Sequence, residues 1–344
     1  MFFLLFAVLA CTPQKDKIYR KSKILMDTII TISAVSDSSD KAEMAIDKAF
    51  SEIEKIDKLV NFFSDKSEVS EINKNAGQKP VKVSYETFEA LEKAIYASEK
   101  TNGAFDVTIG PEISLWDFHN KIKPEDKAIK KRLPLVTYRG LILNKKIPSV
   151  YLKKRGMLID PGGMAKGYAA DRAVEAMKKN GIKSGLVAIA GDIKTFGIKP
   201  DGKHWRIGIR NPRAIPPLVK GGEGGLSDEI MATMEMTDMA ISTSGDYERY
   251  FIIEGKRYHH ILNPKTGYPA DGCQSVSVIA KDGAITDPFS TGIFILGPEK
   301  GLKLLEEMGL DGIIVDKDGK IYTTSNLRGK IEIIRDSQGL GKNN

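Results

Sequence analysis

Four stretches of the 344-residue chain combine side chains that could carry out chemistry. The first, residues 160–171 (DPGGMAKGYAAD), follows a strand-like segment at 157–159 and begins a predicted helix that runs to about Lys179 and stops at Gly181. Its small residues let the backbone approach a ligand, the free N–H groups of a helix start favour phosphate, and Lys166 adds positive charge. The Walker order Gly-Lys-Ser/Thr is absent, and the glycines taken alone fit a tight structural turn better than a phosphate site.

The second and third stretches contain apolar and polar groups suited to a cleft. Residues 101–111 are predicted to join a helix end to a strand, with Phe105 as an apolar wall and Asp106 as an acceptor for ring or ribose donors. The third, residues 242–247 and 258–267, holds hydroxyls, an aspartate and the adjacent His259 and His260. It has neither a nucleophile-elbow motif nor zinc-ligand spacing, so one histidine could belong to the core and the other act as a general base.

The fourth stretch, residues 284–292, places Asp287 and Thr291 four residues apart. If a helix starts after Pro288, both side chains share one face as hard oxygen ligands suited to Mg²⁺ or Ca²⁺. The alternative is that Asp287 caps a helix whose first residue is Pro288. Taken alone, this stretch fits the cap better.

The segments around these stretches have the periodicity of a mixed α+β protein. Residues 23–35 alternate as a half-buried strand, and Asp40 with Glu43 resembles a capping box before a helix with an apolar face from Ile46 to Val60. A second helix is predicted from a Ser84 cap to Gly103. Near the C-terminus, residues 298–308 are predicted to be a helix, and 312–315 and 320–323 to be strands.

The predicted organisation is a single catalytic unit over residues 23–335, which could comprise two lobes, because no repeat or clean linker divides it. Residues 213–227 lack periodicity and are predicted to be a flexible inserted loop. Residues 336–344 are predicted to be a disordered tail.

The N-terminus resembles a lipoprotein signal. Residues 1–10 are continuously apolar, too short to span a bilayer, and lead into Cys11. Cleavage before Cys11 would leave a lipidated residue and a polar tether over 11–22, and would make the protein exported and anchored at the periplasmic face of the inner membrane. Basic residues before the apolar run are absent, so a frayed apolar terminus is the alternative.

Charge and cysteine content limit the remaining possibilities. The formal charge of +7 comes from 52 basic and 45 acidic residues that are interspersed along the chain, which is typical of a solvated surface and not of a nucleic-acid site. Cys273 is the only cysteine besides Cys11, so acylation of Cys11 would exclude an intramolecular disulfide.

Taken together and in this order, the four stretches resemble the ApbE family, the flavin transferases that move FMN from FAD onto proteins. Residues 26–28 and 63–73 extend the resemblance, which covers about residues 23–334. It implies a T-fold-related unit with FAD and a metal in its cleft. It also implies transfer to a Ser or Thr hydroxyl of an exported redox protein, with release of AMP.

The resemblance assigns roles to individual residues. His260 would accept the proton of the attacking hydroxyl. The metal, usually Mg²⁺ with Ca²⁺ as an alternative, would be bound by the Gly163 carbonyl, Asp287 and Thr291. The FAD contacts would come from eight residues: Met26, Phe63, Ala104, Phe105, Asp106, Asp160, Lys166 and Leu262.

Three positions depart from the family pattern. Phe63 stands where tyrosine is common, Pro161 replaces a common leucine, and Ala190 precedes Gly191 where relatives often have two glycines. Ala190 must therefore avoid a positive φ or tolerate its cost. Two alternatives to a transferase remain open, a Mg²⁺-dependent FAD pyrophosphatase that makes FMN and AMP, and a non-catalytic FAD-binding lipoprotein.

Overall fold

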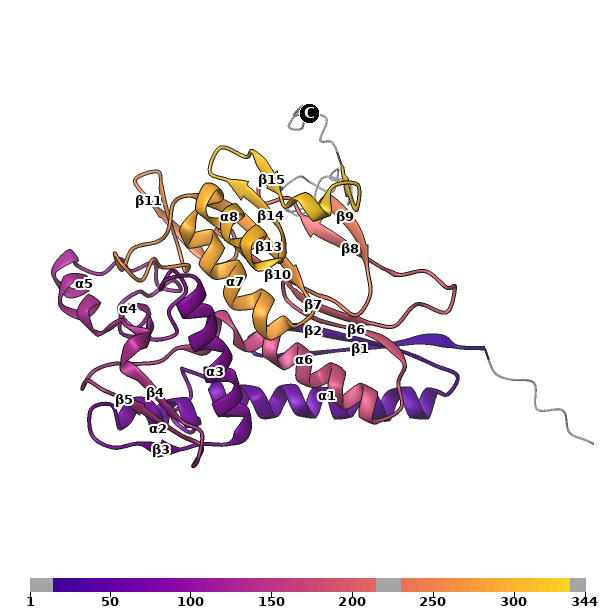
Figure 1. Ribbon diagram of the computed structural model, residues 1–344, viewed down its shortest axis with the longest axis horizontal. Coiled ribbons are helices and arrows are strands. Elements are labelled where there is room, and N and C mark those ends of the chain that lie inside the picture. The colour runs from indigo at the N-terminus through magenta and orange to yellow at the C-terminus, as the bar shows by residue number, and fades with distance from the viewer. Residues whose placement is uncertain (1–14, 215–229, 335–344) are drawn as a thin grey trace, which may run out of the picture.

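The computed structural model describes residues 15–214 and 230–334, and these are built around one large antiparallel sheet (Figure 1). Each strand of this sheet pairs antiparallel with its neighbours. In spatial order the eight strands are β1 (Lys17–Leu25), β2 (Thr28–Ser36), β6 (Ser184–Ile189), β7 (Asp192–Phe196), β10 (Ala240–Gly245), β13 (Cys273–Ala280), β14 (Asp311–Asp316) and β15 (Ile321–Thr323).

Helices cover one face of the sheet, as Figure 1 shows. Apolar residues at helical spacing bury one side of each helix against strand residues such as Ile30, Ile32 and Val276, which forms the main hydrophobic core. The helices are α1 (Ser39–Val60), α3 (Tyr85–Lys100), α6 (Ala165–Lys179), α7 (Gly283–Leu296) and α8 (Pro298–Met308).

A small sheet covers part of the opposite face. Its strands are β16 (Ile331–Ile333), β9 (Ile230–Met236) and β8 (Trp205–Arg210), in that order. Trp205 and Met234 pack against large-sheet residues such as Val35 and Ile279 to form a second core. The large sheet is therefore buried on both faces over part of its width.

The remaining elements form the end of the molecule where α5 lies in Figure 1. A third cluster, centred on Trp116, Phe251, Tyr258 and Leu262, joins two of these helices to a hairpin. The elements are α2 (Glu68–Lys74), α4 (Gly110–Ile113), α5 (Asp126–Arg132), the sheet of β3 (Val81–Lys82), β5 (Ser149–Leu152) and β4 (Leu141–Asn144), and the hairpin of β11 (Tyr250–Ile253) and β12 (Lys256–His259).

The predicted first strand at 23–35 is wrong in its extent, because this region is a hairpin. β1 ends at Leu25, Met26 and Asp27 form the turn with φ of 52° and 56°, and β2 begins at Thr28. The turn contains no glycine, and the alternation of residues 28–34 belongs to β2 alone. Since β1 begins at Lys17, the predicted tether over 11–22 is also too long.

Helix boundaries agree with the sequence more closely. Ser84 caps α3 by accepting a hydrogen bond from the Thr87 backbone, and Gly181 follows α6 with a φ of 79°. For α1, the predicted capping box at Asp40 is wrong: Ser38 caps the helix, and Asp40 lies in its first turn. The predicted helix over 298–308 is confirmed as α8, and the two C-terminal strands as β14 and β15.

Two further predictions are wrong. Residues 101–111 lead into the short helix α4 and not into a strand, and 157–159 contribute only an isolated bridge between Leu158 and Ile109. Cys11, most of the predicted loop over 213–227 and the predicted tail over 336–344 lie outside the described residues. Within 15–214 and 230–334, no helix combines the length and apolar character needed to cross a membrane.

Candidate active site

The predicted site begins where α6 and α7 cross. Gly167 in α6 faces Gly283 in α7 so closely that a Cβ on either residue would collide with the backbone of the other. At this crossing the Gly167 N–H donates a 3.0 Å hydrogen bond to Asp287 Oδ2. The first and fourth sequence stretches therefore meet in the structure.

Two buried carboxylates share one ammonium group at this crossing. Lys166 Nζ lies 3.0 Å from Asp192 Oδ2 and 3.6 Å from Asp287 Oδ2. Burial and the neighbouring Asp192 charge raise the pKa of Asp287 to about 7, against the opposing effects of Lys166 and the Gly167 N–H. Burial disfavours the charged form of Lys166, but the two carboxylates raise its pKa overall. The cluster thus has an excess of buried negative charge.

Hydroxyl groups line the next turn of α7. Thr291 Oγ1 lies 3.1 Å from Ser244 Oγ, which also bonds Ser290 Oγ at 2.8 Å. The predicted shared face of Asp287 and Thr291 is confirmed, because both residues lie within α7. The alternative in which Asp287 caps the helix is wrong, since α7 begins at Gly283 and Pro288 lies inside it.

The donor set fits a small divalent cation. Besides Asp287 and Thr291, Gly163 lies here, because a Cβ built on it would be 3.5 Å from Thr291 Oγ1. These groups are hard oxygens beside uncompensated negative charge, and Mg²⁺ commonly takes few protein ligands when phosphate oxygens and water supply the rest. Residues 15–214 and 230–334 contain no group of three or more His, Cys, Asp or Glu placed to hold a metal.

The two adjacent histidines have different roles in the structure. His259 is buried, with Nε2 2.7 Å from the Ala270 carbonyl and Nδ1 accepting from the Ile261 N–H, so both ring nitrogens are used by the fold. His260 Nδ1 lies 3.3 Å from the Arg249 carbonyl, and because that oxygen can only accept, Nδ1 carries the proton and Nε2 keeps a lone pair. Burial, with the charges of Arg249 and His259, lowers the pKa of His260 to about 3, so its imidazole is neutral at pH 7.

Residues 104–106 support the site from one side. Ala104 and Phe105 are buried, and a Cβ on Gly163 would be 3.2 Å from the Phe105 ring. Asp106 accepts hydrogen bonds from the Thr108 backbone and hydroxyl and from the Tyr138 N–H. The Asp106 carboxylate therefore links two backbone segments. It does not point into an open cleft.

The other predicted FAD contacts come from four separate segments of the chain. Asp160 accepts from the Gly162 N–H at 2.8 Å, and burial raises its pKa. Met26 is at the turn of the first hairpin, and Phe63 follows α1 with 76% of its surface exposed. Leu262 packs in the aromatic cluster.

The family departures have specific structural consequences. Ala190 has a φ of 52°, so it adopts the left-handed conformation that glycine would occupy without strain. Pro161 occupies the start of the 3₁₀ turn Pro161–Gly163, where proline is well tolerated. Phe63 is largely exposed and packs edge-on against Phe62, so part of its ring is accessible for stacking.

Three contacts of this site were not predicted from the sequence, although Ser244 lies in the third stretch. Asp192 pairs with Lys166, the Ser244 hydroxyl contacts Thr291, and Arg249 contacts His260 through its carbonyl. Asp192 follows the Ala190-Gly191 turn. In a sequence, a carboxylate after small residues is only a weak indication of a functional site. The pairing of Asp192 across 26 positions with Lys166 needs the tertiary structure.

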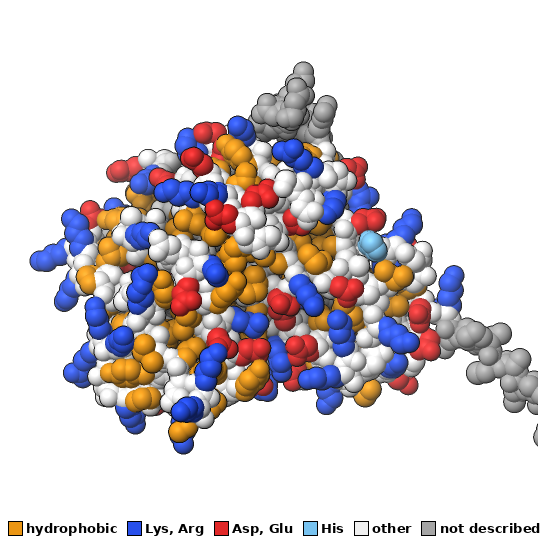
Figure 2. All heavy atoms as spheres, in the orientation of Figure 1, with side chains coloured by type: hydrophobic (Ala, Val, Ile, Leu, Met, Phe, Trp, Pro, Cys, Tyr) orange, Lys and Arg blue, Asp and Glu red, His pale blue; other side chains and the backbone are white. Residues whose placement is uncertain are grey.

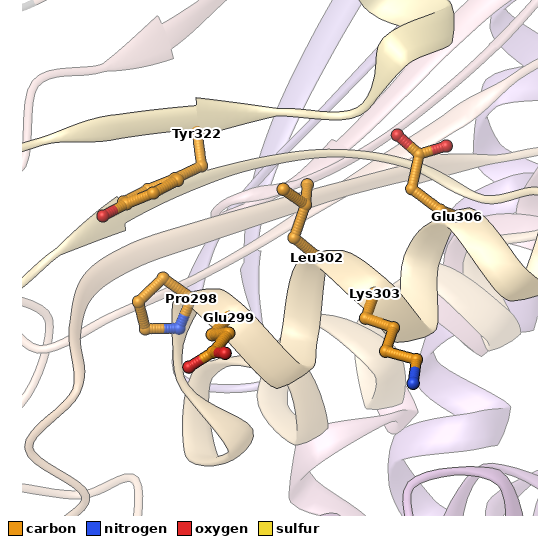
Figure 3. A pocket seen from close by; sticks show the side chains of 6 residues that line it. All are labelled: Pro298, Glu299, Leu302, Lys303, Glu306 and Tyr322. Carbon is orange, nitrogen blue, oxygen red and sulfur yellow. The ribbon is translucent and has the colours of Figure 1, made fainter.

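A separate hollow of about 600 Å³ lies between α8 and β15, lined by Pro298, Leu302 and Tyr322 with three charged side chains (Figure 3). None of its lining residues belongs to the four sequence stretches, and Glu306 there already accepts from Ser325. The chemistry is therefore concentrated at the α6–α7 crossing.

Comparisons with known proteins point to one family. The ApbE family model matches residues 26–314. The FAD:protein FMN transferase of Klebsiella pneumoniae is 33% identical over 314 residues, which cover 90% of this chain and 93% of that protein. The protein of the same name from Treponema pallidum is 28% identical over 334 residues, or 92% of this chain and 89% of that protein.

Solved structures agree with these sequence matches. The ApbE protein of Thermotoga maritima superposes with a TM-score of 0.82 at 31% identity, over 93% of this chain and all of that chain. The apo flavinyl transferase ApbE of Pseudomonas stutzeri gives a TM-score of 0.79 at 28% identity, over 92% and 97%. The similarity thus extends over nearly the whole fold.

Proposed function

The chain belongs to the ApbE family, and from this premise we propose that the α6–α7 crossing is the centre at which it acts as an FAD:protein FMN transferase. The observation that carries the assignment is the buried cluster of Lys166, Asp192 and Asp287. Lys166 and the start of α6 favour a pyrophosphate, and a divalent cation on the surplus carboxylate would offset the negative charge that otherwise opposes it.

The proposed reaction joins FMN to a protein hydroxyl. A Ser or Thr oxygen of the acceptor attacks the FMN-side phosphorus, the bond to the bridging oxygen breaks, and AMP leaves with that oxygen. His260 accepts the hydroxyl proton at Nε2, the nitrogen that its contact with Arg249 leaves unprotonated. Lys166, held by Asp192, offsets negative charge on the phosphates.

We further propose that Mg²⁺ is held by Asp287, Thr291 and the Gly163 carbonyl, with Ca²⁺ as an alternative. When bound, the ion would supply charge stabilisation to the phosphate oxygens. Support comes from the surplus of buried carboxylate at this point and from the hard oxygens around it. Position 163 suits glycine, because a Cβ there would require the Phe105 ring to move.

The location of the protein is also a proposal. Residues 1–10 and Cys11 match a lipoprotein signal, so we place the enzyme outside the cytoplasm, anchored by lipid at the periplasmic face of the inner membrane. An exported redox protein would then be an accessible acceptor. A start of β1 at Lys17 leaves a short connection between Cys11 and the folded part.

The deciding measurement is the intact mass of candidate acceptor proteins incubated with the full-length chain in detergent, FAD and Mg²⁺, with AMP and free FMN quantified. An acceptor heavier by one FMN, with equimolar AMP, supports the transferase. FMN and AMP without an adduct would indicate an FAD pyrophosphatase. FAD bound without any turnover would indicate a binding protein.

A matched pair of variants tests the ligand set. Asp287→Asn keeps the size of the side chain but removes its charge, so turnover should fall by at least ~100-fold and respond to added Mg²⁺ only weakly. Asp316→Asn, at a carboxylate that holds the turn before β15, should keep the Mg²⁺ response. Full activity of Asp287→Asn at limiting Mg²⁺ would contradict the assignment.

A further inference from the structure

Exposed lysines gather around the aromatic cluster that adjoins His260. We define the basic lobe as residues 110–132 and 250–268, which comprise α4, α5, the β11–β12 hairpin and the turn that follows it. Its exposed carboxylates are three, Glu125, Asp126 and Glu254. Its exposed lysines are seven, Lys121, Lys123, Lys127, Lys130, Lys131, Lys256 and Lys265. Five of these lysines come from residues 121–131, and the fold adds Lys256 and Lys265 to the same lobe.

Figure 2 shows blue side chains at the edge of the molecule where Figure 1 places α5. The fold makes little use of these charges. Lys123 approaches Asp126 at 3.7 Å, and Lys256 lies over the Tyr258 ring. The three lysines of α5, at 127, 130 and 131, form no ion pair with any residue in 15–214 or 230–334. Charge that the fold leaves unpaired on one face is available to a partner.

The basic lobe includes His260, the proposed proton acceptor, and hydrogen bonds join the two chain segments of the lobe. Trp116 Nε1 donates to the Gly267 carbonyl at 3.1 Å, and the Tyr268 hydroxyl donates to Asp126 in α5. Residues 263–268 follow His260 and Leu262 directly in the chain. A partner bound to α5 would thus sit beside the segment that carries the proposed proton acceptor.

Neither FAD nor the membrane accounts well for this charge. The phosphates of FAD have the buried Lys166 cluster, whereas the α5 lysines are on the outer surface. The N-terminal end of β1 and α5 lie at opposite ends of the long axis in Figure 1. An extended link from Cys11 to Lys17 spans at most about 20 Å, which would keep the β1 end, and not α5, near the lipid.

We propose that the basic lobe docks an acidic surface of the acceptor protein and thereby brings the accepting hydroxyl to His260. The inference rests on the proposed function and identifies the chemistry of its protein substrate. Complementary charge around a reaction site speeds encounter and fixes orientation, and its contribution falls as ionic strength rises.

The test uses two synthetic peptides that share a central threonine, one flanked by Asp and Glu and the other by Asn and Gln. Binding to the full-length chain in detergent is measured by fluorescence anisotropy at low and high salt, with FAD present. The acidic peptide should bind at least ~10-fold more tightly at low salt. In the triple variant Lys127→Glu, Lys130→Glu, Lys131→Glu this preference should fall below ~2-fold.

The matched control changes three exposed helical lysines elsewhere, Lys48→Glu in α1 and Lys300→Glu with Lys303→Glu in α8. This control variant should retain the preference for the acidic peptide. Both triple variants should bind FAD as tightly as the unchanged chain. Equal binding of the two peptides, or the same preference in the α5 variant, would overturn the proposal. Loss of FAD binding in the α5 variant would assign the lysines to FAD instead.

Vesicles that contain 30% phosphatidylglycerol distinguish a lipid surface from a protein. If the α5 variant loses vesicle binding but keeps its preference for the acidic peptide, the basic lobe is a membrane contact and the proposal fails. The proposed transferase activity is judged separately by AMP release with protein acceptors. If no transferase activity is found, the preference for the acidic peptide would still be observed. The transferase hypothesis and the docking hypothesis can therefore be separated.

Discussion

At the scale of single residues, substitutions of the adjacent His259 and His260 should differ in their effects on stability and on the transfer rate. His259 bonds the Ala270 carbonyl and stacks edge-on to Phe294, so His259→Ala removes a buried partner and should lower the free energy of unfolding by about 2–4 kcal/mol. His260→Ala should change the free energy of unfolding by less than ~1 kcal/mol but lower the transfer rate by ~10²–10⁴. Urea unfolding and single-turnover transfer at saturating FAD measure the two effects.

FAD affinity is the control for the histidine pair. Removal of a proton acceptor should leave the Kd for FAD within about 3-fold, because the loss falls on the chemical step. If His260→Ala weakens FAD binding as much as it slows transfer, His260 binds FAD and does not accept the proton. Normal transfer by this variant would remove it from the mechanism altogether.

Glu112 should make stability depend on pH. Its carboxyl is fully buried next to Gly267 and accepts no hydrogen bond from the described residues. Burial raises the pKa of Glu112 from about 4.5 to about 7, although Arg132 opposes this. Below pH 4.5 the group is protonated in both folded and unfolded chains. Between pH 4.5 and 7 the unfolded chain loses the proton first, so stability falls as pH rises.

Glu112→Gln removes this titration. The variant should resemble the unchanged chain near pH 4.5 and exceed it by up to about 3 kcal/mol above pH 7.5, as measured by urea unfolding at both pH values. Glu99→Gln, at an exposed position, should have the same small effect at both pH values. A gain for Glu112→Gln that is equal at pH 4.5 and 8 would contradict the buried charge as its cause.

Ala190 adopts a strained backbone conformation, and a substitution by glycine can remove the strain. Its φ of 52° costs an L-residue about 1–2 kcal/mol, whereas glycine adopts it freely but loses more entropy on folding. Ala190→Gly should therefore raise the free energy of unfolding by about 0.5–1 kcal/mol. Ala188→Gly, in the middle of β6, should lower it by a similar amount. Destabilisation by Ala190→Gly would show that the turn tolerates alanine without strain.

At the scale of elements, the crossing of α6 and α7 positions the site. A methyl group on Gly167 would collide with the Gly283 carbonyl and press on Asp287 Cβ. Gly167→Ala should therefore push the helices apart, lower the free energy of unfolding by about 2–4 kcal/mol, and weaken the response of turnover to Mg²⁺. Unfolding in urea and a Mg²⁺ titration of turnover measure the two losses.

Gly208→Ala is the control for the crossing. Its added methyl would meet only the end of the Ile230 side chain, which can move, so stability should change by less than ~1 kcal/mol. If Gly167→Ala is tolerated as well as Gly208→Ala, the close approach of the two helices does not set the position of Asp287.

The elements also show which features a single sequence can predict. α1 and α8 were predictable because their apolar residues recur at helical spacing over several turns. The first hairpin was not, because Met26 and Asp27 adopt positive φ without the glycine or asparagine that usually marks such a turn. The start of α7 was also missed, since Pro288 normally marks the first turn of a helix and here lies inside one.

At the scale of the whole molecule, the site depends on contacts between distant parts of the chain. The resemblance to the ApbE family predicted Asp287, Thr291 and Lys166 for the proposed metal and phosphate site, whereas their spacing alone fitted a helix cap and a tight turn. Their partners Asp192 and Ser244 come from β7 and β10 and meet them only after the sheet has formed.

The proposed lipidation of Cys11 gives a prediction for how the protein is held in the cell. The proposed attachment is through lipid at Cys11. In cells that express the full-length chain, Cys11→Ser should move the protein from the membrane fraction to the soluble fraction. Its turnover with a soluble acceptor should stay within about 2-fold, because the cluster at Lys166 lies elsewhere. Cys273→Ser, at a buried thiol, should leave the protein in the membrane fraction. Retention of Cys11→Ser on membranes after a high-salt wash would show that another part of the chain anchors it.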